Sequence, residues 1–333
     1  MGKKNSLQKK LAVAMSVVNV INAGAPVALP YVNLAGQMST RGGQIKAIGH
    51  GENALFYGTA QAEEYNVPAE STTSVSVDTM SNGDTMNVSN GGTGTVTTMS
   101  GGSQAVNSGG TGTVTTMSGG TQTIEEGGNG TVTTMTNGDQ EVSGGGSGTV
   151  ITMHDGCQDV EGTGTVITMS DGMQNIHNSG TGTVSTMSAG SQIVNDGGMG
   201  TVTTMNGGGQ AVWGTGTVTT MSGGTQTIEK GGNGTVSTML GGVQNVSSGA
   251  TGNVTTMNGG EQIVESGGTG TVTTMNSDGM QNIFDGATGT VNTMNGGIQA
   301  VKIGGTGNIT SMSGGEQFVV GTGTVTSMIS GTQ

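Results

Sequence analysis

The amino-acid sequence predicts an all-β solenoid, a β-helix of about fifteen stacked coils of 18 residues each. Two observations favour this fold: a methionine returns at near-constant spacing, and Val or Ile always stands three residues before it. Most intervals are 18 residues long, the length of one coil that packs its apolar side only against its neighbours. The methionines of the series are Met80, Met99, Met117, Met135, Met153, Met169, Met187, Met205, Met221, Met239, Met257, Met275, Met294, Met312 and Met328.

Departures from the 18-residue spacing fall in two glycine-rich connections and never in the segments between them. Three intervals are 16 residues long and shorten the connection that reads Asn107-Ser108-Gly109-Gly110 in its full form. Two intervals are 19 residues long and lengthen the connection that follows the methionine. Insertions and deletions collect in surface loops, so we predict a turn at each connection and a strand on either side of it.

The segment that ends at each methionine is predicted to be the first strand of the coil. Three residues before the methionine the chain has Val or Ile, and one residue before it has Thr or Ser. The position between them varies, as in Thr97, Ile151 and Asn292. An alternation of fixed and variable positions is typical of a strand with one face in the core, so we expect the fixed positions to face inward. The methionines then fill a narrow core that lacks aromatic residues.

The second strand is predicted from a repeated Gln-x-Val or Gln-x-Ile. Gln104 precedes Val106, and the same pair recurs as far as Gln317 and Val319, while the residue between them varies. We therefore expect the glutamine and the aliphatic residue to point inward. Glutamine side chains that stack in register form coil-to-coil amide ladders, which satisfy polar groups that are costly to bury alone.

The N-terminal part of the chain differs from the array. Lysines between residues 3 and 10 precede a mostly apolar run from Leu11 to Pro30, which is the layout of a secretory signal peptide. An N-terminal helix or membrane anchor is the alternative, and Asn19 and Asn22 make the run a weak spanning helix. The predicted organisation is a signal peptide over 1–30, a linker and N-terminal cap over 31–74, and the solenoid over 75–333.

Composition argues against several classes of function. The formal net charge is −13, and beyond Lys46 the basic residues are Lys230 and Lys302, so nucleic-acid binding is not expected. Cys157 stands alone, which excludes a disulfide framework and a cysteine metal cluster. Calcium binding by glycine-rich repeats needs Asp where every copy has Val or Ile, such as Val96, and no His or Cys recurs beside the methionines to bind copper. We therefore expect no metal and no cofactor.

The repeat unit reads Gly-Gly-Thr-x-x-x-x-Thr-Met-x-x-Gly-Gly-x-Gln-x-Val. It resembles the strand-loop-strand repeats in the passenger region of AIDA-type autotransporter adhesins of Gram-negative bacteria, over roughly Val75 to Gln333. The resemblance implies a β-helical passenger, exported to the cell surface, outer membrane or extracellular space, with roles in adhesion and aggregation. In some members heptosyltransferases modify Ser and Thr. This chain has Met where the family more often has Val, and its first turn is usually one residue shorter than the family's, so we infer no glycan specificity from the resemblance.

The resemblance also implies partners. These are a ligand on a host or bacterial surface, other copies of the chain through self-association, a glycosyltransferase, and an outer-membrane translocator. The sequence ends at Gln333 in the middle of a coil. We therefore expect either a fragment or a chain whose export and anchoring rely on another protein.

No catalytic constellation is visible, because His50, His154 and His177 share no motif, and an enzyme is not expected. The first hypothesis is a surface adhesin passenger whose outward Thr residues are contact groups or O-glycan acceptors. The alternative is an ice-binding solenoid that uses outward Thr-x-Thr rows, although residues such as Ile151, Ile167 and Asn292 interrupt them. The candidate residues are Thr95, Thr97, Thr113, Thr115, Thr131, Thr133, Thr201, Thr203, Thr217, Thr219, Thr271 and Thr273.

Overall fold

The computed structural model describes residues 37–41, 44–48, 62–68 and 73–333. The chain divides into two compact units, Met1–Ala54 and Leu55–Gln333. In the first unit, β1 (Gln37–Arg41) pairs antiparallel with β2 (Gln44–Ile48). The predicted signal peptide, residues 1–30, lies outside the described residues. No helix long and apolar enough to span a membrane occurs in the ranges that are described.

The second unit is built from two ladders of parallel strands. The long strands that end at the methionines are β4 (Ser74–Met80), β9 (Ser147–Met153), β11 (Thr163–Met169), β13 (Thr181–Met187), β15 (Met199–Met205), β17 (Thr215–Met221), β19 (Asn233–Met239), β21 (Thr251–Met257), β23 (Thr269–Met275), β25 (Thr288–Met294), β27 (Thr306–Met312) and β29 (Thr322–Met328). The short strands are β3 (Glu64–Val67), β5 (Thr85–Val88), β10 (Cys157–Val160), β12 (Met173–Ile176), β14 (Ser191–Val194), β16 (Gly209–Val212), β18 (Thr225–Ile228), β20 (Val243–Val246), β22 (Glu261–Val264), β24 (Met280–Ile283), β26 (Ile298–Val301) and β28 (Glu316–Val319). The strands β6 (Thr93–Val106), β7 (Thr111–Ile124) and β8 (Asn129–Val142) run through the intervening turn and belong to both ladders.

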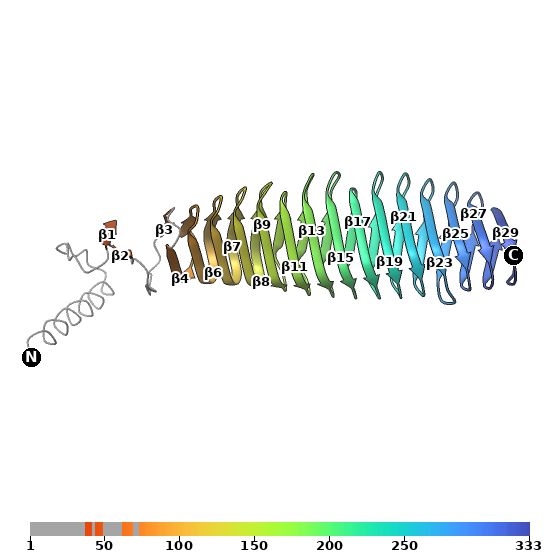
Figure 1. Cartoon of the computed structure of the whole chain (residues 1–333), viewed down its shortest axis with the longest axis horizontal. Helices are drawn as coiled ribbons and strands as arrows, with labels where there is room; N and C mark the ends of the chain where they lie inside the picture. The colour runs from red at the N-terminus through yellow and green to blue at the C-terminus, as the bar shows by residue number, and fades with distance from the viewer. Residues whose placement is uncertain (1–36, 42–43, 49–61, 69–72) are drawn as a thin grey trace, which may run out of the picture. The chain divides into compact units, whose positions relative to one another are not determined.

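Successive coils pair in strict register. Met169 lies between Met153 and Met187 in the long-strand ladder, and Gln174 lies between Gln158 and Gln192 in the short-strand ladder. Because every pairing in this unit is parallel and joins one coil to the next, the chain winds as a solenoid (Figure 1). The predicted fold class is confirmed, with about fourteen turns between the first and last methionine of the series.

The described coils begin earlier than the visible repeat. β3 pairs with β5, and this pairing places Tyr65 beside Met86, which in turn lies beside Gln104. Tyr65, Met86 and Gln104 therefore occupy one inward column. The stack thus extends back to Glu64, within the stretch 31–74 that was assigned to a linker and cap.

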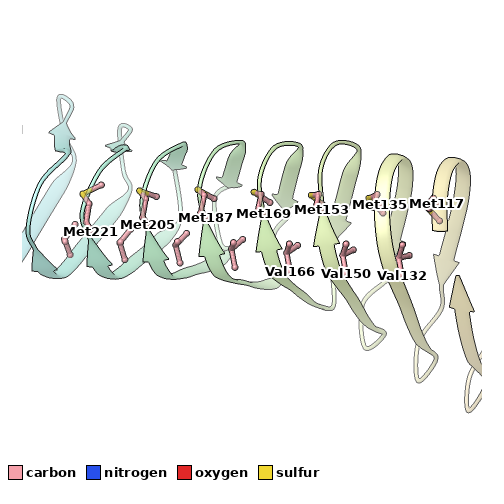
Figure 2. Packing of buried hydrophobic residues seen from close by; sticks show 14 of the residues in the cluster. Met117, Val132, Met135, Val150, Met153, Val166, Met169, Met187, Met205 and Met221 are labelled. Atoms are coloured by element: carbon pink, nitrogen blue, oxygen red, sulfur yellow. The ribbon is translucent and has the colours of Figure 1, made fainter. Parts of the chain in front are cut away.

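The core consists of inward rows that run along the stack. Val and Met of the long strands form two adjacent rows, and the methionines that end these strands, from Met80 to Met312, have no exposed surface (Figure 2). The glutamines from Gln104 to Gln317 are equally buried. From Gln122 onward, each amide nitrogen donates to the amide oxygen of the preceding coil, as in Gln192 Nε2 to Gln174 Oε1 at 2.7 Å. The predicted glutamine ladder is confirmed, and no buried side-chain polar atom among the described residues lacks a partner.

The expectation for the Thr before each methionine is wrong. In β6, Val96 and Met99 are both buried, but Thr98 is half-exposed. Val and Met lie three residues apart, so both can face the core only where strict alternation breaks between them. The pairing shows this break, because Val96 and Thr98 have ladder partners and Thr97 has none. The Thr or Ser before each methionine therefore lies on the outer surface.

Glycines allow the coil to close. Gly102 and Gly109 adopt φ values of 77° and 71° in the two turns, a left-handed conformation that favours glycine. Gly182 is extended, but a Cβ there would lie 2.4 Å from Ile176 Cδ1 and 2.8 Å from Gln174 Oε1. The backbone of the long strand therefore packs directly against the core residues of the short strand.

Candidate functional site: the threonine face

The outward residues of the long strands form one continuous surface, which we call the threonine face. It comprises the positions six, four, two and one residue before each methionine. In the repeated segment Thr-Gly-Thr-Val-Thr-Thr-Met, four side chains point outward, and Gly, Val and Met are buried. Parallel pairing aligns each position with its copies, so that Thr113 lies between Thr95 and Thr131. Neighbouring strands are ~4.8 Å apart, so the hydroxyls form regular columns along the stack.

The predicted site residues all lie on this face. The first member of each pair is half-buried, namely Thr95, Thr113, Thr131, Thr201, Thr217 and Thr271. The second member is exposed in Thr97, Thr115, Thr203, Thr219 and Thr273, and half-buried in Thr133. In the described part of the chain no hydrogen bond engages these twelve hydroxyls, whereas the hydroxyls of Thr123 and Thr136 do bind protein acceptors. The twelve side chains are therefore free to bind other molecules.

Sequence reasoning missed a further column. The residue immediately before each methionine is Thr from Thr79 to Thr293 and Ser at Ser311 and Ser327, and it is at least partly exposed throughout. This is the most uniform hydroxyl column on the threonine face. The sequence shows that this position is always Thr or Ser. We expected it to face inward because a strand with unbroken alternation places every second residue in the core.

Apolar, amide and acidic residues interrupt the columns. Ile151 and Ile167 are 37% and 43% exposed and lie in successive coils, since their neighbours Val150 and Val166 are ladder partners. Asn replaces Thr at a few positions, for example Asn292. The threonine face is thus a polar surface that carries a charge at Asp78 in its first coil, and its exposed apolar residues are Ile151, Ile167 and Met199.

Most charged side chains of the solenoid lie in its turns, and a few, such as Asp139 and Asp159, lie on the outer side of the short strands. Cys157 is the first residue of β10 and lies beside Asp139. Burial raises the pKa of its thiol to about 12, and Asp159 and Asp139 add to the shift. Burial and Asp159 also raise the pKa of Asp139.

The histidines add no reactive centre to this surface. His177 Nε2 lies 3.2 Å from Asp159 Oδ1, and His154 Nδ1 lies 2.8 Å from the Ser170 hydroxyl. Within the described ranges no group of three or more His, Cys, Asp or Glu side chains is arranged to hold a metal ion. The described side chains thus offer extended rows of hydroxyls and no convergent cluster of acids, bases and nucleophiles.

No protein-family model and no curated protein matches the chain. Among solved structures, the chain is similar to the crystal structure of the TibA55-350 fragment, hyper-glycosylated by TibC, with 25% sequence identity and a TM-score of 0.49. The similarity covers 85% of this chain and 98% of that fragment. A TM-score of this size does not assign the chain to a family.

Proposed function

We propose that the solenoid is the exported passenger of a bacterial surface protein and acts in adhesion and aggregation. Its outward Thr and Ser hydroxyls are the contact groups and the acceptors of O-linked glycans. The observation that carries this proposal is the threonine face, on which free hydroxyls repeat in register over about fourteen turns. The resemblance of the repeat unit to the AIDA-type adhesins points to the same role and to a Gram-negative cell surface.

A periodic face suits weak, repeated contacts. Each Thr pair offers two hydroxyls, and a partner that bridges several coils gains avidity because each further contact is intramolecular. A glycosyltransferase could modify the same residues without unfolding the chain, because the second hydroxyl of nearly every pair is exposed. The proposal assigns no catalysis, cofactor or nucleic acid to the chain.

The intact mass of the protein recovered from its native host after export tests this proposal. A mass raised by multiples of a heptose or hexose is the expected result. An unmodified mass would remove the glycan-acceptor part of the proposal. The same protein produced without the host's glycosyltransferases is the control for any mass change that is unrelated to glycans.

Ice binding remains the second proposal, because the Thr pairs form the regular rows that an ice-matching face needs. Ice binding is the weaker proposal, because the first Thr of each pair is half-buried and because Ile151 and Ile167 replace the second Thr in their coils. Thermal hysteresis of the unmodified protein measures it directly, and no activity at high concentration would exclude it.

A further inference from the structure

The second turn of each coil forms one edge of the solenoid, and three copies of it are short. The full-length turn has four residues, such as 195–198, whereas the short turns contain two, namely Glu161-Gly162, Trp213-Gly214 and Val320-Gly321. The turns that lead into β11 and β17 stand lower than their neighbours along the upper edge of Figure 1. We call Trp213-Gly214, together with the flanking turns 195–198 and 229–232, the Trp213 step.

The short turn interrupts a backbone ladder along this edge. In full-length turns the third residue donates its N–H to the matching carbonyl of the next coil, as Gly231 does to Gly249 at 3.2 Å and Gly249 to Gly267 at 2.9 Å. The Trp213 turn has no residue at this place. The N–H of Gly197 therefore lacks its backbone acceptor, and the carbonyl of Gly231 lacks its donor. These two groups point toward the Trp213 coil from opposite sides, about 9.6 Å apart, which is twice the strand spacing.

Trp213 lies at the centre of the step. Its N–H donates to Val194 O at 2.8 Å, and Glu229 N–H donates to Val212 O at 2.8 Å, so Asn195, Trp213 and Glu229 lie in register on three successive coils. The indole is 40% exposed, and no hydrogen bond or ring contact engages it in the described part of the chain. It is also the single Trp of the whole sequence. An aromatic side chain is thus available at the surface, on a turn that is shorter than the turns on each side.

Charged residues lie on the turns that flank Trp213. Asp196 and Lys230 are exposed there, and Glu229, which is in register with Trp213 on the next coil, is half-exposed. These three side chains form no ion pair with one another, because the ion pair within 4 Å among the described residues joins His177 and Asp159. Two carboxylates and one ammonium group are therefore free to bind a ligand, in addition to the N–H of Gly197 and the carbonyl of Gly231.

We propose that the Trp213 step binds one neutral pyranose ring of a glycan. One face of such a ring is made of C–H groups, which stack on an indole, and its rim carries hydroxyls that both donate and accept. Carboxylates at Asp196 and Glu229 accept from these hydroxyls, and the Lys230 ammonium donates to them. A small apolar platform with a few convergent polar groups is the usual composition of a ligand site.

Two other ligands fit less well. A quaternary ammonium ion also binds Trp, but its sites are cages with several aromatic walls, and the aromatic residues of the array besides Trp213 are Phe284 and Phe318, several coils away. An acidic sugar would meet two carboxylates and one ammonium group on a chain with a net charge of −13. A neutral sugar avoids both difficulties.

The site is separate from the threonine face, so unmodified full-length protein suffices for its test. Methyl glycosides of glucose, galactose, mannose and N-acetylglucosamine are titrated against it, with Trp fluorescence and saturation-transfer NMR as readouts. Because the chain has one Trp, the fluorescence reports this site alone. We expect at least one glycoside to shift the emission with a Kd in the millimolar range, which is typical of a single small contact.

Three variants separate the step from general surface effects. Trp213→Ala should weaken binding at least tenfold. Insertion of Ser-Gly after Trp213 keeps the ring but restores the full-length turn, and it should also abolish binding. Phe284→Ala is the matched control, because Phe284 occupies the same place in a full-length turn and is 43% exposed. The proposal is overturned if no glycoside binds, if Trp213→Ala binds as well as the unchanged protein, or if Phe284→Ala loses binding equally.

Discussion

Replacement of one ladder glutamine by glutamate should make the stability of the solenoid depend steeply on pH. Gln192 is fully buried, donates to Gln174 Oε1 at 2.7 Å and accepts from Gln210 Nε2 at 2.6 Å. In the variant Gln192→Glu, a protonated carboxyl can make both bonds, because its O–H replaces the N–H donor. An ionised carboxylate places an oxygen against the oxygen of Gln174 and has no cation beside it. The ionised form is therefore the one that destabilises the fold.

The magnitude follows from the pKa of the new carboxyl. Burial without a cation raises the pKa of a carboxyl by about 3 units, from an unfolded value of about 4.3. Below pH 4.3 the carboxyl is neutral in both the folded and unfolded states and costs little. The cost grows as the pH rises, because the unfolded state ionises first, and it reaches about 3–4 kcal/mol at pH 7. Stability is thus lost as the pH rises toward the folded pKa.

Hydrogen exchange is the suitable assay, since repeat arrays open locally and need not unfold as one unit. At pH 7 the amides of β12, β14 and β16 should exchange about 100- to 1000-fold faster in Gln192→Glu than in the unchanged protein. At pH 4 the two proteins should nearly agree. The matched control is Ile193→Glu, which places the same charge on the outer face one residue away. Equal exchange of the two variants at pH 7, or a defect that persists at pH 4, would refute the reasoning.

Three further predictions concern packing and reactivity. Gly182→Ala should destabilise the array, because the new Cβ meets Ile176, whereas Gly144→Ala meets nothing within 4 Å and should change the free energy of unfolding by less than about 0.5 kcal/mol; a thermal melt in which the two variants agree would contradict this. Met187→Ala should cost about 2–5 kcal/mol through the cavity it leaves, measured by urea denaturation, and a loss below 1 kcal/mol would mean that the core collapses around it. The thiol of Cys157, with its pKa raised to about 12, should react with iodoacetamide at pH 8 about a thousandfold more slowly than a free thiol, and faster in Asp159→Asn than in the unchanged protein; rapid alkylation of the unchanged protein would show that burial and the neighbouring carboxylates do not raise the pKa of the thiol in this way.

The inward half of the coil could be predicted because its copies agree. Val, Met and Gln recur without a break, and each places the same chemical group at the same depth in the next coil. The first coil escaped this comparison, because Tyr65 and Met86 stand in the column where later coils have Gln. A tyrosine can close the end of a narrow core, but it carries no trace of the repeat.

The outer surface was harder to predict, for two physical reasons. A local break in the strand at Thr97 exposes Thr98 and turns Met99 inward, and simple alternation contains no such break. The Trp213 step consists of three turns that are neighbours in space, and the coil-to-coil register is needed to show which turns these are. The surroundings of Cys157 also depend on the register, because Asp139 of the preceding coil is the ladder partner of Cys157.

The most direct test of the central claim is to change the hydroxyls of the threonine face without changing the fold. The chain itself supplies the substitutions, since Asn292 and Ser185 already occupy the exposed column that contains Thr97. Two proteins are compared on the cell surface, one with Asn and one with Ser at the twelve predicted Thr positions, and the measurement is adhesion of the displaying cells to a host or bacterial surface. The account predicts that the Ser protein adheres like the unchanged protein and that the Asn protein does not. Full adhesion by a folded Asn protein would contradict it.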